Sequence, residues 1–148
     1  MVKMLAQAKM LRKPNVYDQM VYIPGPLPGL NEIIAAAKSG SGRSNAYARL
    51  KKEWTERIAW QFKIQNLRPV KRAYFEFLWI EKNRQRDPDN ISAGKKFVLD
   101  AMVEAGLMPK DGWRNVAGWA DKFKIAGNGE EAGVRVSVMN CEIGLFDD

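Results

Sequence analysis

The stretch from Arg72 to Glu81 constrains the fold more than any other part of this sequence. Phe75, Phe77 and Trp79 alternate with residues that are also mostly apolar, which is the period of an extended strand. Because both faces of such a strand are apolar, it is expected to lie in the interior of a sheet. We therefore predict a central β-strand here, whose carboxyl end leads into a polar segment.

Three further strands and two main helices are expected around this strand. The strands are predicted at residues 19–24, 116–125 and 134–139. Apolar residues at three- or four-residue spacing predict a long helix to about Asn66 and a second helix at Ile91–Ala105. The predicted fold class is α/β, more closely α+β: a single compact domain with a mixed sheet of about four strands packed with two main helices.

Capping residues place the ends of the predicted helices. Ser44 or Asn45 is expected to cap the long helix, and Gly106 to close the second at the position where a left-handed glycine is common. A short helix is expected to follow a cap at Asn31 and to run through Ala37.

The length and composition fit one domain. The chain has 148 residues, of which 46% are hydrophobic, so a real core is expected. Residues 1–19 are predicted to be a basic, mobile extension and residues 20–148 the folded domain. No apolar run is long enough for a membrane span, and Cys141 is the only cysteine, so we expect a cytoplasmic protein without an internal disulfide.

Charge and the lack of histidine narrow the function. A net charge of +7 suits a polyanionic partner, of which nucleic acid is the common one. With no histidine in the chain, His–metal nucleases, histidine general bases and Ser-His triads are excluded. A hydrolase with this composition has to work through carboxylates, lysine and a metal ion.

Two carboxylates follow the central strand directly. Asp87 and Asp89 are two residues apart, and Pro88 biases Asp87 to an extended conformation. Side chains two apart on an extended chain point the same way, so we expect the pair to share a direction. Mg²⁺ is typically held by one or two carboxylates together with water and substrate phosphate oxygens. The ordinary alternative is a solvated turn in which Asp89 or Asn90 caps the next helix.

Further charged residues follow at regular positions. Lys95 and Lys96 begin the second helix, and Asp100 lies one turn after Lys96 on the same face. Asp111 comes five residues after Gly106, and we expect the helix to turn the chain back so that Asp111 approaches the aspartate pair. The alternative for Lys96 is a salt bridge with Asp100 alone.

The pattern resembles the RusA family of Holliday junction resolvases, especially its phage and prophage branch. The residues that carry the resemblance are Arg86-Asp87-Pro88-Asp89-Asn90, Lys95-Lys96-Phe97-Val98-Leu99-Asp100-Ala101, Gly106-Leu107-Met108 and Asp111-Gly112-Trp113, with Tyr22-Ile23-Pro24-Gly25 and Leu27-Pro28-Gly29-Leu30-Asn31-Glu32 before them. The resemblance spans roughly Met20 to Met139. The order and spacing of the acids and the lysine are fairly specific, whereas each piece alone is weak.

This resemblance implies a Mg²⁺-dependent homodimeric endonuclease that cuts branched DNA, above all four-way junctions, in phage or bacterial recombination and repair. It implies that Asp87, Asp89 and Asp111 bind the metal, with Mn²⁺ as a substitute, and that Lys96 is the active-site lysine, with Lys95 as the less favoured candidate. The fold would be RusA-like and the compartment the cytoplasm of a bacterial host cell. The segment between Asp89 and Lys96 is longer than in the best-known members, and Lys110 stands where the family often has a second acid.

Other residues have supporting roles in this interpretation. Contacts to the DNA backbone are expected from five cations: Arg84, Arg86, Lys95, Lys38 and Arg43. Asn90 is expected to be a cap, Asp100 to orient Lys96 or the metal shell, and Trp113 to be a core residue or loop anchor rather than a base-stacking wedge.

Two other functions stay open. The first is a noncatalytic protein that binds branched DNA, in which the aspartates are structural. The second is a nuclease with a broader range of substrates that includes flaps and replication forks. Junction cleavage with Mg²⁺ separates the first from a resolvase, and a comparison of branched substrates separates the second.

Overall fold

The computed structural model describes residues 17–39 and 45–141. In chain order its elements are β1 (Gln19–Pro24), α2 (Leu30–Lys38), α3 (Ala46–Ile64), β2 (Ala73–Glu81), α4 (Pro88–Ser92), α5 (Lys95–Glu104), β3 (Val116–Ile125) and β4 (Gly133–Asn140). The four predicted strands are confirmed, two of them with identical bounds. The mixed α+β class is confirmed as well.

The strands form one mixed sheet in the order β1-β4-β2-β3. β4 pairs antiparallel with both β1 and β2, whereas β2 and β3 are parallel, with Ala73 opposite Val116 and Glu81 opposite Ile125. β2 is therefore an interior strand, as its apolar sequence predicts. The parallel pair is joined by a crossover that contains α4 and α5, so the chain leaves one end of β2 and returns to the other before β3 begins.

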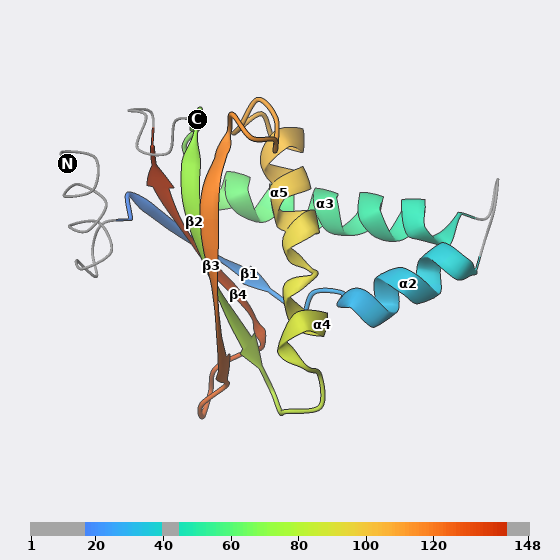
Figure 1. Cartoon of the computed structure of the whole chain (residues 1–148). Coiled ribbons are helices and arrows are strands. Elements are labelled where there is room, and N and C mark those ends of the chain that lie inside the picture. The colour runs from blue at the N-terminus through green and yellow to red at the C-terminus, as the bar shows by residue number, and fades with distance from the viewer. Residues whose placement is uncertain (1–16, 40–44, 142–148) are drawn as a thin grey trace.

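The helices lie on one side of the sheet (Figure 1). On this face of the sheet, Phe75, Phe77 and Trp79 of β2 form a buried row of rings. Successive ring centroids are 6.0 and 5.8 Å apart. The row of rings packs in one core with buried residues of the helices, among them Ile58, Phe62, Phe97, Val98 and Met102. Burial of these large side chains is the main source of stability for the fold.

The predicted caps are partly correct. The side chain of Asn45 accepts a hydrogen bond of 2.9 Å from the backbone N–H of Ala48, so Asn45 caps α3 as expected. Gly106 has a φ of +71° after α5. The N–H of Leu107 donates to the carbonyl of Met102 at 2.9 Å, which closes the helix in a Schellman motif.

Two predicted boundaries are wrong. The cap of α2 is Gly29 rather than Asn31. The predicted helix at Ile91–Ala105 is two helices, because α4 ends at Ser92 and α5 begins at Lys95. A Cβ on Gly94, in the break, would lie 3.1 Å from the Leu27 side chain and 3.2 Å from the Pro28 carbonyl oxygen. The break thus lets the chain pass closely beside the loop before α2.

The start of the described chain belongs to the sheet. Asp18 donates its backbone N–H to Val138 at 2.9 Å, and the Tyr17 hydroxyl donates to Glu76 at 2.8 Å. Both residues were assigned to the N-terminal extension, so the folded part begins before the predicted residue 20. Gln19 begins β1, and residues 1–16 of that extension lie outside the described residues. Among the described helices, none has both the length and the apolar character needed to cross a bilayer.

Candidate functional site

Asp87 and Asp89 lie just beyond the carboxyl end of β2. Asp87 is the N-cap residue of α4 with φ −74° and ψ 153°, the extended conformation expected before Pro88. Asp89 is already in the first turn of α4, so the argument from alternating strand positions is wrong for the pair. Both residues are exposed.

A pocket of about 450 Å³ opens beside Asp87. Its lining comes from the segment that follows β2, from α4 and from the end of β3, and includes Arg84, Asp87, Ile91 and Phe123. Ligand sites are common at the carboxyl ends of such strands. The pocket therefore gives Asp87 a concave, partly apolar surrounding with a cation at its rim.

The two carboxylates have no structural partner. Within the described chain, no hydrogen bond or ion pair involves the side chain of Asp87 or Asp89, and Asp87 does not cap α4 with its side chain. Exposed oxygen ligands with free lone pairs are the donors that Mg²⁺ accepts while it keeps several waters. The two aspartates thus fit a magnesium site of one or two protein carboxylates.

Asp111 does not join them in one chain. Its loop is attached to the entry of β2, because Val70 donates its N–H to Leu107 at 2.8 Å and Ala73 donates to Asn115 at 2.9 Å. β2 has 9 residues, and at about 3.3 Å per residue it separates this loop from Asp87 by roughly 26 Å. In residues 17–39 and 45–141, no group of three acidic or cysteine side chains is placed to hold a metal.

The expected approach of Asp111 to Asp87 and Asp89 is therefore wrong within a single copy. The physical reason is the parallel pairing of β2 and β3. A crossover between parallel strands must return to the starting end of the first strand. A residue just before β3 and a residue just after β2 therefore lie at opposite ends of the sheet.

Arg86 is a structural residue. Its guanidinium donates to both carboxylate oxygens of Glu81, at 2.7 and 3.0 Å, and to the carbonyl of Leu27 at 2.9 Å. Only 19% of the side chain is exposed. Arg86 lines the pocket as well, so its predicted contact with DNA stays a prediction, but the side chain is held in the fold between the end of β2 and the loop before α2.

Asn90 also serves the fold, but not as the cap of its own helix. Its side-chain oxygen accepts a hydrogen bond of 3.0 Å from the backbone N–H of Asn31, in the first turn of α2. A Cβ on Gly29 would lie 2.5 Å from this oxygen, so glycine is required for the approach. Asn90 is therefore a helix cap, as expected, but it caps α2 rather than α4: it accepts from a backbone N–H in the first turn of α2.

Lys96 pairs with Asp100, as the simpler interpretation predicted. The two charged groups are 3.5 Å apart, and Lys51 of α3 approaches the same carboxylate at 3.7 Å. Asp100 thus orients Lys96 toward α3, and 53% of the Lys96 side chain is exposed.

Lys95 points the other way, toward β3. Its ammonium nitrogen lies 2.6 Å from Asp121 and 4.6 Å from the centre of the Trp119 ring. Trp79 donates its indole N–H to the second oxygen of Asp121 at 2.8 Å. The predicted contact of Lys95 with DNA is wrong for this structure, since the ammonium group is paired and only 12% of the side chain is exposed.

Sequence reasoning missed Asp121. The available signal was its place between Trp119 and Phe123 on one face of a predicted strand, where a lone acid among aromatic residues needs a partner. Phe123 lines the pocket beside Asp87 and is two residues from Asp121. Lys95 thus ties α5 to β3 two residues from Phe123, but neither Lys95 nor Lys96 lines the pocket itself.

The remaining predicted DNA-binding cations differ in where they lie in the structure. Arg84 is exposed at the pocket, and no partner of its side chain lies in the described part of the chain. Lys38 is exposed at the end of α2. Arg43 lies outside the described residues. Arg84 therefore shares the pocket with Asp87 and has no described partner for its charge.

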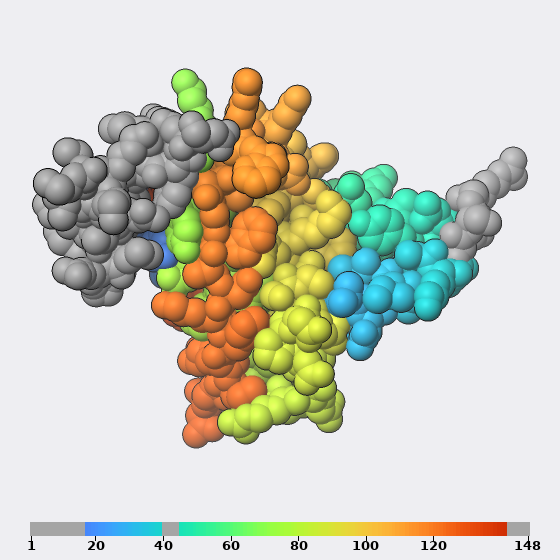
Figure 2. All heavy atoms as spheres, in the orientation of Figure 1, coloured from blue at the N-terminus to red at the C-terminus, as the bar shows by residue number. Residues whose placement is uncertain are grey.

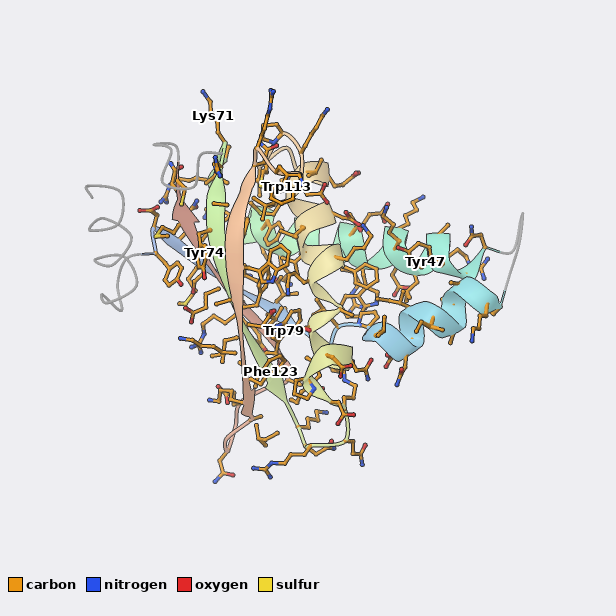
Figure 3. The ribbon with its side chains drawn as sticks, viewed as in Figure 1. Tyr47, Lys71, Tyr74, Trp79, Trp113 and Phe123 are labelled. Atoms are coloured by element: carbon orange, nitrogen blue, oxygen red, sulfur yellow. The ribbon has the colours of Figure 1, made fainter. Side chains whose placement is uncertain are left out.

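Trp113 is neither a core residue nor a loop anchor. Its exposed fraction is 88%, and it lies at the far end of the sheet from Phe123 (Figure 3). The expectation for Trp113 is wrong because the loop is anchored by its neighbours, Leu107 and Met108, which are buried.

Comparisons with known proteins give no family assignment. No model of a known protein family matches the sequence, and no curated protein is similar to it.

Proposed function

We propose that this chain is a Mg²⁺-dependent, structure-selective endodeoxyribonuclease that acts on four-way DNA junctions. The observation that carries the proposal is the pair of exposed carboxylates, Asp87 and Asp89, which have no partner among the described residues; Asp87 lines a pocket at the carboxyl end of β2. The net charge of +7 favours a polyanionic substrate. The resemblance to the RusA family gives the substrate class.

Asp87 and Asp89 would hold the metal ion. When bound, Mg²⁺ supplies Lewis-acid activation of water and offsets charge on the phosphate. Arg84, whose guanidinium at the same pocket has no partner in the described part of the chain, binds the DNA backbone and helps to position the phosphate. The apolar part of the pocket, near Ile91 and Phe123, limits the access of bulk water to the phosphate.

A site that uses all three aspartates needs two copies of the chain. Asp111 lies at the opposite end of β2 from Asp87, so one copy cannot bring the three together. In two copies related by a two-fold axis perpendicular to the strands, the β2 strands are antiparallel. The Asp111 end of one copy then faces the Asp87 end of the other. We propose that Asp111 completes the site of the partner subunit in a homodimer. A four-way junction, which must be cut at two matched points, suits such a pair of sites.

The direct test is cleavage of a synthetic four-way junction by the purified protein, with Asp89→Asn and Arg86→Lys beside it. We expect paired, symmetric nicks with Mg²⁺ or Mn²⁺, none in chelator, and none from Asp89→Asn. Cleavage by Asp89→Asn at the parent rate overturns the proposal. Flap and fork substrates in the same gel show how selective the enzyme is for junctions.

A second candidate is a noncatalytic protein that binds branched DNA. The absence of a three-acid metal group within the described part of one chain favours it. It predicts tight binding of the junction with no product under any metal, which the same gel and a parallel binding assay detect.

A further inference from the structure

The loop between α5 and β3 presents an aromatic side chain to the solvent among positive charges. Trp113 is the most exposed of the large hydrophobic side chains described, at 88%. An indole that stays in water loses the large favourable free energy of burying its apolar surface. An exposed tryptophan therefore marks a contact surface more often than an exposed leucine does.

Three cations surround Trp113 at this end of the molecule. Lys110 and Arg114 flank it in the loop, and Lys71 lies at the adjacent entry to β2, all three exposed. None of their side chains has an ion pair within the part of the chain that the structure describes. Figure 2 shows side chains of this end, in the green of residues near 71 and the orange of residues near 110–114, projecting beyond the body of the protein.

The loop holds Trp113 in place. Asn115 donates its side-chain amide to the carbonyl of Lys71 at 2.7 Å, and its backbone N–H to Gly112 at 3.0 Å. Val116 donates to the same carbonyl of Gly112 at 2.9 Å, while Leu107 and Met108 anchor the other end in the core. Both ends of the loop are thus fixed, so the backbone that carries the indole loses little further entropy on binding.

We infer that Trp113 stacks on an unpaired or distorted DNA base next to the branch point, while Lys71, Lys110 and Arg114 hold the flanking phosphates. Every base has a face on which an indole can stack, so this contact recognises an opened helix rather than a sequence. A fully stacked duplex offers no such face. The loop would therefore supply selectivity for branched over linear DNA.

The inference deepens the proposed function and rests on it. Trp113 is two residues from Asp111, which at about 3.5 Å per residue places it within roughly 7 Å along the chain. If Asp111 completes the metal site of the partner subunit, Trp113 stands beside the phosphate that is cut. A stacked base there would hold the strand against the site.

The test is binding of labelled junction and linear duplex by Trp113→Ala, Trp113→Phe and Trp60→Ala, with Ca²⁺ in place of Mg²⁺. Trp60 is the matched control, because it is 58% exposed on α3 and already has Lys63 over its ring at 5.9 Å. We expect Trp113→Ala to weaken junction binding about 5- to 150-fold, the range for loss of one base stack. Duplex binding should change little, Trp113→Phe should retain most of the affinity, and 2-aminopurine at the branch point should report the loss of stacking.

The outcomes separate this inference from the proposed function. Junction cleavage by the parent together with unchanged junction binding by Trp113→Ala overturns the stacking role alone. Selective loss of junction binding in Trp113→Ala, from a parent that never cuts, sustains the stacking and overturns the nuclease. Loss of binding that tracks loss of the dimer in light scattering assigns Trp113 to a protein interface and overturns the inference, and a parent that binds no DNA overturns both.

Discussion

At the scale of single residues, neighbouring cations have opposite roles. Arg84 and Arg86 are two apart in sequence, and both were expected to contact DNA. In the structure Arg86 is held by Glu81 and Leu27, whereas Arg84 stands at the pocket without a described partner. The sequence shows the charge of each residue but not the acid it meets, because Glu81 belongs to a buried strand end where a carboxylate requires a partner.

Replacing each of these two arginines by alanine should separate an effect on protein stability from an effect on DNA binding. Arg86→Ala leaves Glu81 buried without its partner, so we expect a loss of roughly 3 kcal/mol in the free energy of unfolding. Arg84→Ala, the matched control, should stay within about 0.5 kcal/mol of the parent and weaken DNA binding instead. Urea unfolding measures the first effect and fluorescence anisotropy the second. Equal stability of the two variants would contradict the structural role of Arg86.

At the scale of elements, the sequence predicts the strands well and the crossover poorly. The strand bounds follow from local alternation, which depends on burial of one or both faces at the same positions. The break at Ala93-Gly94 depends on the distant residues Leu27 and Pro28, which no local pattern reveals. The position of Asp111 depends on whether β2 and β3 run parallel, and this direction is a property of the pair rather than of either strand.

The contact between α5 and β3 should be energetically coupled. Lys95 and Asp121 are 2.6 Å apart and mostly buried, so each removed alone leaves the other without a partner. We expect a double-mutant cycle of Lys95→Ala and Asp121→Ala to give a coupling energy above about 1 kcal/mol. The i,i+4 pair Lys96–Asp100, in which the Lys96 side chain is 53% exposed, should give about 0.3–0.5 kcal/mol in the same experiment. Equal coupling in the two cycles would argue against Lys95 as the residue that ties α5 to the pocket side of the sheet.

At the scale of the whole molecule, four groups with a raised pKa are acids kept neutral by the fold, whereas hydrogen bonds from Lys124 and the Gly127 backbone lower the pKa of the Glu130 carboxyl. Burial raises the pKa of the Cys141 thiol above its usual 9.0. It also raises the pKa of Tyr17, Tyr22 and Tyr74 above 10.0, and a hydrogen bond to Glu76 adds to the effect at Tyr17.

The four raised pKa values predict a loss of stability in alkali. Each of these four groups has a higher pKa in the folded state, so its contribution is complete below the unfolded pKa and is lost as the pH rises through the folded one. With no histidine, no histidine titration falls in the neutral range. We expect the free energy of unfolding, measured in urea, to fall as the pH rises above about 9 to 10. Tyr17→Phe should reduce the slope, and stability that rises above pH 10 would contradict the account.

The whole-molecule proposal also explains why part of the candidate site was predictable and part was not. Asp87 and Asp89 are two residues apart in sequence, so their place after a central strand could be inferred. The third aspartate is distant in the chain, and a single copy does not bring it to the pair. Its proposed partner is in another copy, and no pattern within one chain shows how two copies meet.

One measurement tests this central claim most directly: junction cleavage by a mixture of Asp89→Asn and Asp111→Asn, refolded together, with each variant alone as the control. Each variant alone should be inactive. In a mixed dimer with shared sites, both substitutions fall in one site and the other site is intact. Because random exchange makes about half of the dimers mixed, we expect about a quarter of the parent activity, as single nicks. A mixture that stays inactive, although pull-down of one variant through an affinity tag recovers the other, would contradict a site built from two copies.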